Sequence, residues 1–238
     1  FVCGAGAIAA FRAASMRASM SARFSGMLMT AQNLARAAAR LNAGLDVMVA
    51  RPDGKPLRTF PGRCSLALMT DDDRLPDPVA AARALPKGSL VIVRARDAKR
   101  RHALGDALRM QTHGLILLAA DDPVLADCLH GLHLPEAHAR DAAHWRALRP
   151  HWVITVAAHS SRGLQAPYAD AALLSPVFAT KSHPGAKTLT PVRARLMAQR
   201  ALLPVLALGG VTARNAALLP GFSGIAAIGS LGASARSR

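Results

Sequence analysis

Two short apolar runs near the end of the chain finish in glycine, and these residue types in this order suit the binding of an anion. Residues 204–210 read Pro-Val-Leu-Ala-Leu-Gly-Gly, and residues 224–230 read Gly-Ile-Ala-Ala-Ile-Gly-Ser. Glycine has no side chain, so its backbone amide is open to an approaching ligand. An amide at the start of a helix also favours negative charge, and phosphate is the usual occupant. The pattern predicts a phosphate site at Gly209, Gly210, Gly229 and Ser230; the alternative is that these glycines only permit tight turns.

Two arginines follow another apolar run. Arg94 and Arg96 come at the end of the run 89–93, which is rich in β-branched residues. Cations at alternate positions of an emerging strand can neutralise a second anionic group, such as a pyrophosphate or a carboxylate, through charge-assisted hydrogen bonds. The competing interpretation is a solvated loop without a ligand. We therefore take both arginines as candidate substrate-binding residues.

The elements that would position these residues form a regular alternation. Apolar runs of this length are typical of strands buried on both faces of a parallel sheet. They cover residues 64–70, 89–94, 114–119, 131–134, 152–157, 171–174, 204–209 and 224–229. Helical patterns separate them over residues 76–85, 98–111, 123–129, 136–148 and 211–219. Eight such units predict an α/β protein with a compact TIM (β/α)8 barrel, whose functional residues lie at the carboxyl ends of the strands. The alternative is a doubly wound open sheet.

The two ends of the chain differ from this pattern. The tail after Gly229 is too short to form a full eighth helix, so we expect the last helix to be truncated. Residues 1–62 are rich in Ala, Arg, Ser and Met, and their only acidic residues are Asp46 and Asp53. We interpret 1–62 as a mostly mobile appendage with one helix over 30–45, and 63–238 as the barrel domain. We expect that helix to pack beside the first and eighth strands; in the competing view, the leader is disordered and a partner subunit covers the gap.

The composition narrows the choice of partners. Lys and Arg number 30 against 14 Asp and Glu, so the formal net charge is +16. Such a charge suggests nucleic acid, an acidic membrane surface or anionic substrates. The charge is dispersed, however, and no zinc-finger spacing or RNA-binding aromatic signature is present, which argues against nucleic acid. No apolar run reaches the roughly 18 residues of a membrane helix.

The spacing of the cysteines indicates whether the protein belongs to an oxidising or a reducing compartment. Cys3, Cys64 and Cys128 lie far apart in the sequence and form no Cys-x-x-Cys motif. This spacing argues against a disulfide framework and fits a reducing compartment. We expect a cytoplasmic protein with a small anionic substrate, and the sequence leaves a homo-oligomer open.

Three motifs taken together resemble the thiamine phosphate synthase/TenI family. The first is Ala-Asp at 169–170 followed by Ser-Pro-Val-Phe-x-Thr-Lys-Ser-His-Pro-Gly at 175–185. The second is Pro-Val-x-Ala-x-Gly-Gly-Val-Thr at 204–212, and the third is Gly-Ile-Ala-x-Ile-Gly-Ser at 224–230. The resemblance covers residues 64–232. It implies a TIM barrel that binds a phosphorylated thiazole and works in thiamine biosynthesis.

The resemblance also implies roles for single residues. In the TenI branch, a histidine in the position of His159 is the acid/base of a thiazole tautomerase, and imidazole suits proton transfer near neutral pH. Arg94 and Arg96 keep the two positive charges of the family's usual Arg-Glu-Lys. Thr180 matches a threonine that contacts pyrophosphate in synthases, while His183 stands where they have lysine. Lys181 could substitute for that lysine.

The ends of the third and fourth strands depart from the synthase pattern. A synthase would have Asn-Asp after the third strand, with the aspartate holding magnesium; here Ala119-Ala120 precede Asp121-Asp122, so a match needs a shift. His138 stands where a second magnesium-binding aspartate would fall, and magnesium prefers oxygen ligands. Leu134-Pro135 is more similar to the TenI branch. We therefore expect no metal and no cofactor, with Mg²⁺ required only if the chain is a synthase.

Three functions follow from the sequence. The leading hypothesis is a TenI-like tautomerase in which His159 moves a proton across a carboxythiazole phosphate and aromatises the ring. The glycine amides would hold the phosphate, and Arg94 or Arg96 the carboxylate. The alternative is thiamine phosphate synthase, which joins a pyrimidine pyrophosphate to the thiazole phosphate. A third hypothesis is a non-catalytic ligand-binding or regulatory barrel.

His133, inside the short fourth strand, is expected to be a packed, hydrogen-bonded core residue.

Overall fold

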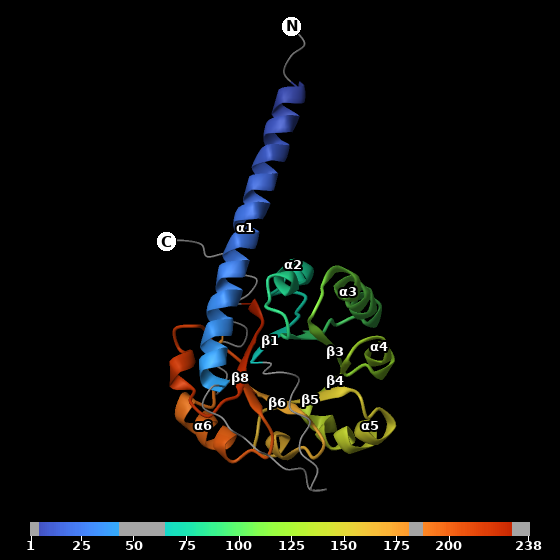
Figure 1. Cartoon of the computed structure of the whole chain (residues 1–238), viewed down its shortest axis with the longest axis vertical. Helices are drawn as coiled ribbons and strands as arrows, with labels where there is room; N and C mark the ends of the chain where they lie inside the picture. Colours follow the sequence, from blue (N-terminus) through green and yellow to red (C-terminus); the bar gives the residue numbers. More distant parts are fainter. Residues whose placement is uncertain (1–4, 43–64, 181–187, 230–238) are drawn as a thin grey trace.

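Eight parallel strands form a closed barrel in sequence order (Figure 1). The computed structural model describes residues 5–42, 65–180 and 188–229. The strands are β1 (Leu66–Met69), β2 (Leu90–Val93), β3 (Ile116–Ala120), β4 (Gly131–Leu134), β5 (Val153–Ala158), β6 (Ala171–Leu174), β7 (Val205–Ala207) and β8 (Gly224–Ala227). The barrel closes where β8 pairs with β1, with Leu66 opposite Ile225. The TIM barrel expectation is confirmed, and the open sheet is excluded.

The helices that follow the strands are short. They are α2 (Pro78–Arg83), α3 (Ala98–Gln111), α4 (Pro123–Cys128), α5 (Ala142–Leu148) and α6 (Pro191–Gln199), with the 3₁₀ helices η2 (Glu136–Asp141), η3 (Gly163–Gln165) and η4 (Ala216–Leu218). The helix expected over 136–148 is therefore divided into η2 and α5. The structure also contains α6, which our reading of the sequence did not include.

Side-chain caps explain where four of these helices begin. Asp77, Asp97, Asp122 and Thr190 each accept a hydrogen bond from the amide three residues later. This bond satisfies an amide that has no partner inside the helix. In α2, α4 and α6 a proline follows the cap, which suits the first helical position because proline has no N–H to leave unpaired.

The helix expected over 211–219 does not form. The Thr212 amide donates to Asn215 Oδ1 at 2.7 Å, and the Asn215 amide donates back to Thr212 Oγ1 at 3.3 Å. Asn215 Nδ2 also donates to the Gly210 carbonyl at 2.9 Å. These side-chain bonds offer the backbone an alternative to the helical ladder. The segment is a turn followed by η4, so the prediction of a full helix after β7 was wrong.

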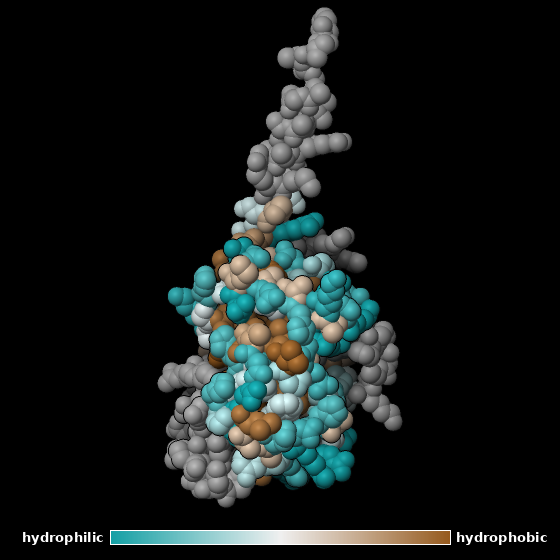
Figure 2. All heavy atoms as spheres, turned by 90° about the vertical axis from the view of Figure 1, so that its right-hand side faces the viewer, coloured by the Kyte–Doolittle hydropathy of each residue, from teal (hydrophilic) through white to brown (hydrophobic). Residues whose placement is uncertain are grey.

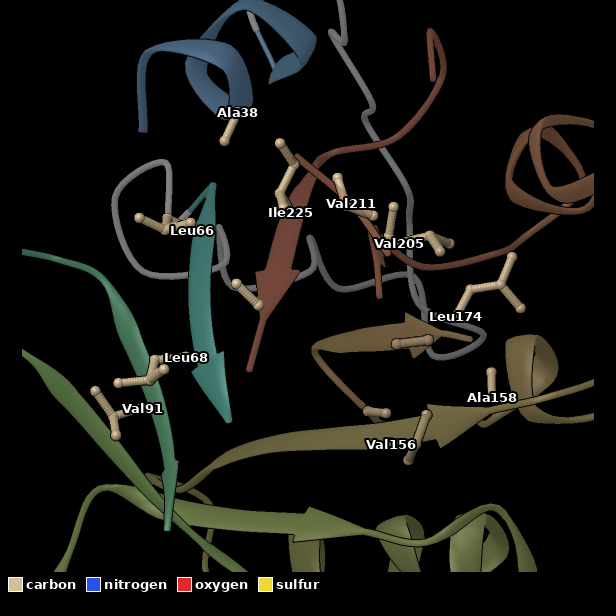
Figure 3. Close-up of a cluster of buried hydrophobic side chains, with 14 of the residues drawn as sticks. Ala38, Leu66, Leu68, Val91, Val156, Ala158, Leu174, Val205, Val211 and Ile225 are labelled. Atoms are coloured by element: carbon tan, nitrogen blue, oxygen red, sulfur yellow. The ribbon is translucent and has the colours of Figure 1, made fainter. Parts of the chain in front are cut away.

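The strands bury both faces, as the apolar runs indicate. Side chains at alternate positions fill the barrel interior, among them Leu90, Ile92, Leu118, Leu173 and Leu206. The outward-facing positions pack under the surrounding helices and form the larger cluster drawn in Figure 3. The interior is thus a packed core, as is usual in this fold.

The outer surface of the barrel is mainly hydrophilic on the side formed by α3, α4 and α5. Figure 2 shows this side, with apolar side chains in small separate groups among polar ones. Exposed apolar residues on these helices include Met110, Val124 and Leu148. Isolated apolar residues of this kind are normal on a protein surface. Among the helices that the structure describes, none is both long and apolar enough to cross a membrane.

The N-terminal segment folds into one long helix, α1 (Ala5–Asn42), where we expected a helix only over 30–45. Its C-terminal part packs against β8, β1, η4 and α2, while its N-terminal part projects away from the barrel (Figure 1). Ala31, Leu34 and Ala38 are buried on the packed side. Figure 3 shows Ala38 beside the outward side chains of Leu66 and Ile225. The boundary that we placed after residue 62 lies outside the described residues.

The position of α1 explains how the outer face of β8 is covered. The last described residue after β8 is Gly229, and α1 contacts both β8 and β1 at the point of closure. A barrel strand needs a partner over its outward apolar face, because that face is otherwise exposed to water. In this structure α1, from the start of the chain, provides that cover beside β8.

Replacing Leu34 tests this packing. Leu34 is 1% exposed, whereas Met29 on the same helix is 66% exposed. Leu34→Ala should lower the free energy of unfolding by about 2–5 kcal/mol, because it removes buried methyl groups and leaves a cavity. Urea denaturation measures this change, with Met29→Ala as the matched control. Two equally small effects would mean that α1 does not contribute to the core.

Candidate active site at the carboxyl ends of the strands

A cavity of about 1070 Å³ opens at the carboxyl ends of the strands. Residues at the end of each of the eight strands, or just beyond it, line its wall. A cavity of this size lies just above the usual range of about 300–1,000 Å³ for small-molecule sites. Of the candidate residues, six line it: Arg94, His159, Thr180, Gly209, Gly210 and Gly229. Arg96 does not, and Lys181, His183 and Ser230 lie outside the described residues.

Gly209 and Gly210 are required by the local backbone. Their φ angles are 95° and 64°, in the region that favours glycine. A Cβ on Gly210 would lie 2.5 Å from the Ala179 carbonyl oxygen, and one on Gly209 would lie 2.9 Å from Pro176 Cα. The tight-turn interpretation therefore holds for this pair, although both residues also line the cavity. In the described residues a turn and the short η4 come after this pair instead of an α-helix, so the helix-dipole part of the phosphate argument does not apply here.

Gly229, after β8, has different surroundings. A Cβ there would meet only Arg74, at 3.7 Å from its Cβ and 3.8 Å from its carbonyl oxygen. These are ordinary contacts, so no described neighbour requires glycine at this position. The missing side chain leaves the backbone of Gly229 open to the cavity, next to an arginine. This corner, formed by β8 and the loop after β1, thus has an open backbone, whereas the backbone of Gly209 and Gly210 after β7 is enclosed by Pro176 and Ala179.

Three arginines give the cavity wall its positive charge: Arg74, Arg94 and Arg101. Arg74 Nη2 lies 2.6 Å from Asp71 Oδ2, and Arg94 Nη2 lies 3.7 Å from the same oxygen. The hydrogen bond from Arg74 lowers the pKa of Asp71 to about 2, against the effect of burial. Asp71 is therefore ionised at neutral pH and holds two arginines at the cavity.

Two of these arginines were not predicted. Arg74 follows β1 in an Asp-Asp-Asp-Arg sequence, and Arg101 lies in the first turn of α3. Arg101 Nε is 3.0 Å from Asp122 Oδ2, and its Nη1 donates to the Ala95 carbonyl at 3.1 Å. The position of Arg74 in the short polar segment after the first apolar run was a signal that could have identified it. Arg101 offered no such signal, because its side chain reaches the cavity from a helix.

Arg96 does not line the cavity but bonds to aspartates of the loop after β1. Its guanidinium pairs with Asp73, and its backbone amide donates to Asp72 Oδ2 at 2.9 Å. Arg100 Nε lies 3.1 Å from Asp72 Oδ1, so the loops after β1 and β2 are joined by ion pairs outside the cavity. The solvated-loop interpretation therefore describes Arg96, whereas Arg94 lies in the cavity wall.

His159 lies at the end of β5 and lines the cavity. Its Nδ1 is 3.0 Å from the Ser175 carbonyl oxygen and 3.3 Å from Ser175 Oγ. A carbonyl oxygen can only accept, so Nδ1 carries the proton in this hydrogen bond. In the neutral ring, Nε2 is then the unprotonated nitrogen and can accept a proton. The side chain is thus set up as a base at the cavity wall.

His133, in β4, is buried and also reaches the cavity wall. Its Nδ1 lies 2.9 Å from Thr155 Oγ1, so it is the packed, hydrogen-bonded residue that we expected. Burial, together with the nearby Arg94 charge, lowers the pKa of His133 to about 4. At neutral pH this ring is uncharged and a poor source of protons.

The ends of β3 and β4 do not offer a pair of carboxylates to a metal. Asp121 lines the cavity, but its Oδ1 lies 3.1 Å from His138 Nδ1. Asp122 caps α4 and binds Arg101 and His102, and these hydrogen bonds outweigh burial and lower its pKa. In the described part of the chain, no group of three or more His, Cys, Asp or Glu side chains is arranged for a metal ion. The donors here fit magnesium poorly, because it prefers several oxygen ligands.

Comparison with known proteins identifies related sequences and folds. Residues 66–231 match the TMP-TENI family model, described as thiamine monophosphate synthase. A curated relative from Aquifex aeolicus (strain VF5), named "Putative thiamine-phosphate synthase 2", is 33% identical over 94 residues, or 38% of this chain and 50% of the relative. The chain thus spans about half the length of that relative.

A solved structure shares the fold. It is a thiamine phosphate pyrophosphorylase from Pyrococcus furiosus, with a TM-score of 0.57 and 21% sequence identity. The match covers 72% of this chain and 89% of that one. At this identity the likeness concerns the barrel fold alone.

The open corner at Gly229 can be tested for anion binding. Gly229→Asp should lower the affinity for a thiazole phosphate about tenfold or more, because a charged contact contributes roughly 1.5–3 kcal/mol. Gly229→Ala is the matched control, since a Cβ fits there without a close contact. Calorimetric titration measures both. Gly210 is unsuitable for this test, because any Cβ would collide with Ala179. Equal affinity in the two Gly229 variants would remove this corner as the phosphate site.

The lowered pKa of His133 predicts a specific pH dependence of stability. Between about pH 6.5 and 4 the unfolded chain binds a proton at this residue and the folded chain does not, so stability falls with falling pH. The expected loss is up to about 3 kcal/mol. Urea denaturation at several pH values should show this component in the wild type and in His113→Gln, where the histidine is exposed. It should be missing in His133→Gln, and an unchanged slope there would contradict the assignment.

Proposed function

The chain belongs to the TMP-TENI family of thiamine monophosphate synthases, and from this premise we propose that it is a TenI-like thiazole tautomerase of thiamine biosynthesis. The observation that carries this proposal is the 3.0 Å contact between His159 Nδ1 and the Ser175 carbonyl oxygen at the cavity wall. The Nδ1 proton is held by the Ser175 carbonyl, which leaves Nε2 as a base at the wall of the cavity. A base held in this way is what proton transfer on a bound ring requires.

The rest of the cavity suits a ligand with two anionic groups. The open backbone at Gly229, next to Arg74, is the proposed phosphate position. Arg94 lies one strand further round the barrel, in the loop after β2, and is the proposed contact for a carboxylate. Arginine binds carboxylates well because its planar group donates two parallel hydrogen bonds. A carboxythiazole phosphate carries both groups, so it is the substrate that we propose.

The proposed reaction moves one proton and leaves the composition of the ligand unchanged. Nε2 of His159 takes a proton from a carbon of the ring system and returns it at a second position, which aromatises the ring. Removal of the proton leaves negative charge on the ligand. The arginines of the wall, fixed by Asp71 and Asp122 before the ligand arrives, would stabilise that charge.

Thiamine phosphate synthase is the second candidate. The description of the family model and the name of the curated relative support a synthase as much as they support a tautomerase. Thr180, proposed as a pyrophosphate contact, lies in the cavity wall. Against it stands the end of β3, where Asp121 faces His138 instead of a second carboxylate. A binding barrel without turnover is the third candidate, and it is the one that remains if neither reaction occurs.

One set of assays separates the three. The full chain is incubated with carboxythiazole phosphate alone, and separately with thiazole phosphate and pyrimidine pyrophosphate, with and without Mg²⁺. Aromatisation in the first incubation supports the tautomerase. Thiamine phosphate formed in the second supports the synthase and overturns our proposal.

His159→Asn tests the catalytic residue. The asparagine amide can still donate to the Ser175 carbonyl, but it cannot act as a base at neutral pH. We expect tautomerase turnover to fall by about 10²–10⁴-fold, while the affinity for the thiazole phosphate stays the same. The exposed His113, changed to Asn, serves as a control that should keep full activity. Loss of binding together with turnover would mean that His159 holds the site together instead.

A further inference from the structure

We propose that Glu136 is a positioning residue that fixes the loop carrying His159, so that the imidazole meets the ligand in one orientation. This inference rests on the proposed function and names a residue that our reading of the sequence did not single out. Glu136 begins η2, directly after β4, whereas His159 follows β5. The contact between them therefore joins the ends of two neighbouring strands at the cavity.

A single carboxylate accepts four hydrogen bonds from the turn after β5. Oε2 of Glu136 accepts from the His159 amide at 3.3 Å. Oε1 accepts from the Ser160 amide at 3.2 Å, from Ser160 Oγ at 2.5 Å and from the Gly163 amide at 3.1 Å. Bonds from several N–H groups to an ionised carboxylate are stronger than those between neutral groups. The turn between β5 and η3 has no helical or strand hydrogen bonds, so these bonds to Glu136 hold it in place.

The turn also packs closely around the carboxylate. A Cβ on Gly163 would lie 2.9 Å from Glu136 Oε1 and 2.8 Å from Ala158 Cα. A side chain at position 163 would therefore collide with the backbone of Ala158 and would also displace the Glu136 carboxylate. Burial raises the pKa of Glu136, but the hydrogen bonds from Ser160, His159 and Gly163 lower it by more. The net effect is a lowered pKa, so the group stays ionised at neutral pH. A permanent charge with four donors is a rigid attachment point.

His159 is thus held from both sides of β5. Glu136, from the β4 side, binds its backbone, and the Ser175 carbonyl, from the β6 side, binds its ring. The first contact fixes where the residue lies, and the second fixes which nitrogen carries the proton.

Glu136→Gln separates the bond to His159 from the others. A glutamine amide has one oxygen and one NH₂ group. With its oxygen toward the three donors of Ser160 and Gly163, its NH₂ group faces the His159 amide, so that bond alone is lost. The matched control is Asp141→Asn, the same acid-to-amide change at the other end of η2, where the side chain makes no capping bond. Two measurements follow on each protein: steady-state tautomerase kinetics and amide hydrogen exchange.

We expect Glu136→Gln to lower kcat by about 10- to 100-fold, the usual effect of a misplaced catalytic group, with KM changed less than about twofold. Exchange at the His159 amide should become at least about tenfold faster, while the Gly163 amide keeps its protection. Asp141→Asn should match the wild type in both measurements. Unchanged kcat in Glu136→Gln, or equal loosening of the whole turn with a raised KM, would overturn the positioning role.

The exchange measurement also keeps the two proposals apart. If the wild type shows no tautomerase turnover, the proposed function fails. The His159 amide still reports on Glu136 in that case, since its exchange needs no substrate. Unchanged exchange at this amide in Glu136→Gln would then reject the positioning role independently.

Discussion

Closure of the barrel depends on the close approach of neighbouring backbones at two glycines. At Gly224, where β8 meets β1, a Cβ would lie 2.2 Å from the Ser65 carbonyl oxygen, and that oxygen accepts the Ile225 amide at 2.8 Å. At Gly131, where β4 meets β5, a Cβ would lie 2.0 Å from the Val153 carbonyl oxygen. A side chain at either position would separate paired strands. Because closure brings the carboxyl ends of all eight strands together, the cavity and its charged wall depend on these contacts.

The charge of the site is organised around a few aspartates. Asp71 holds Arg74 and Arg94, and Asp122 holds Arg101 while it also caps α4. Each arginine is therefore fixed before a ligand binds, so less side-chain freedom is lost on binding. His159 is also fixed before a ligand binds, because its ring and its backbone both form hydrogen bonds within the protein. A preorganised wall of this kind suits the stabilisation of charge that develops during a reaction.

The long helix α1 lies outside the segment that matches the family, which begins at residue 66, yet it contributes to the core. It brings Ala31, Leu34 and Ala38 against β8 and β1. Apolar area buried at this contact stabilises the closure by about 25 cal/mol per Å². The N-terminal appendage is therefore part of the barrel structure over this stretch.

The sequence by itself determined the barrel, because the alternation of apolar runs with helical stretches is a local pattern that repeats along the chain. It also placed Arg94, His159 and the glycines correctly at the strand ends, since each directly follows an apolar run. It failed where long-range contacts decide the outcome. The helix expected over 211–219 is replaced by the paired bonds of Thr212 and Asn215. Arg96 turns away because Asp72 and Asp73 lie across from it, and Arg74 and Arg101 take its place in the cavity. Glu136 and His159 are 23 positions apart in the sequence, and they meet only because β4 pairs with β5. Local periodicity is written in the sequence, but the direction of a charged side chain depends on which partners the closed barrel brings beside it.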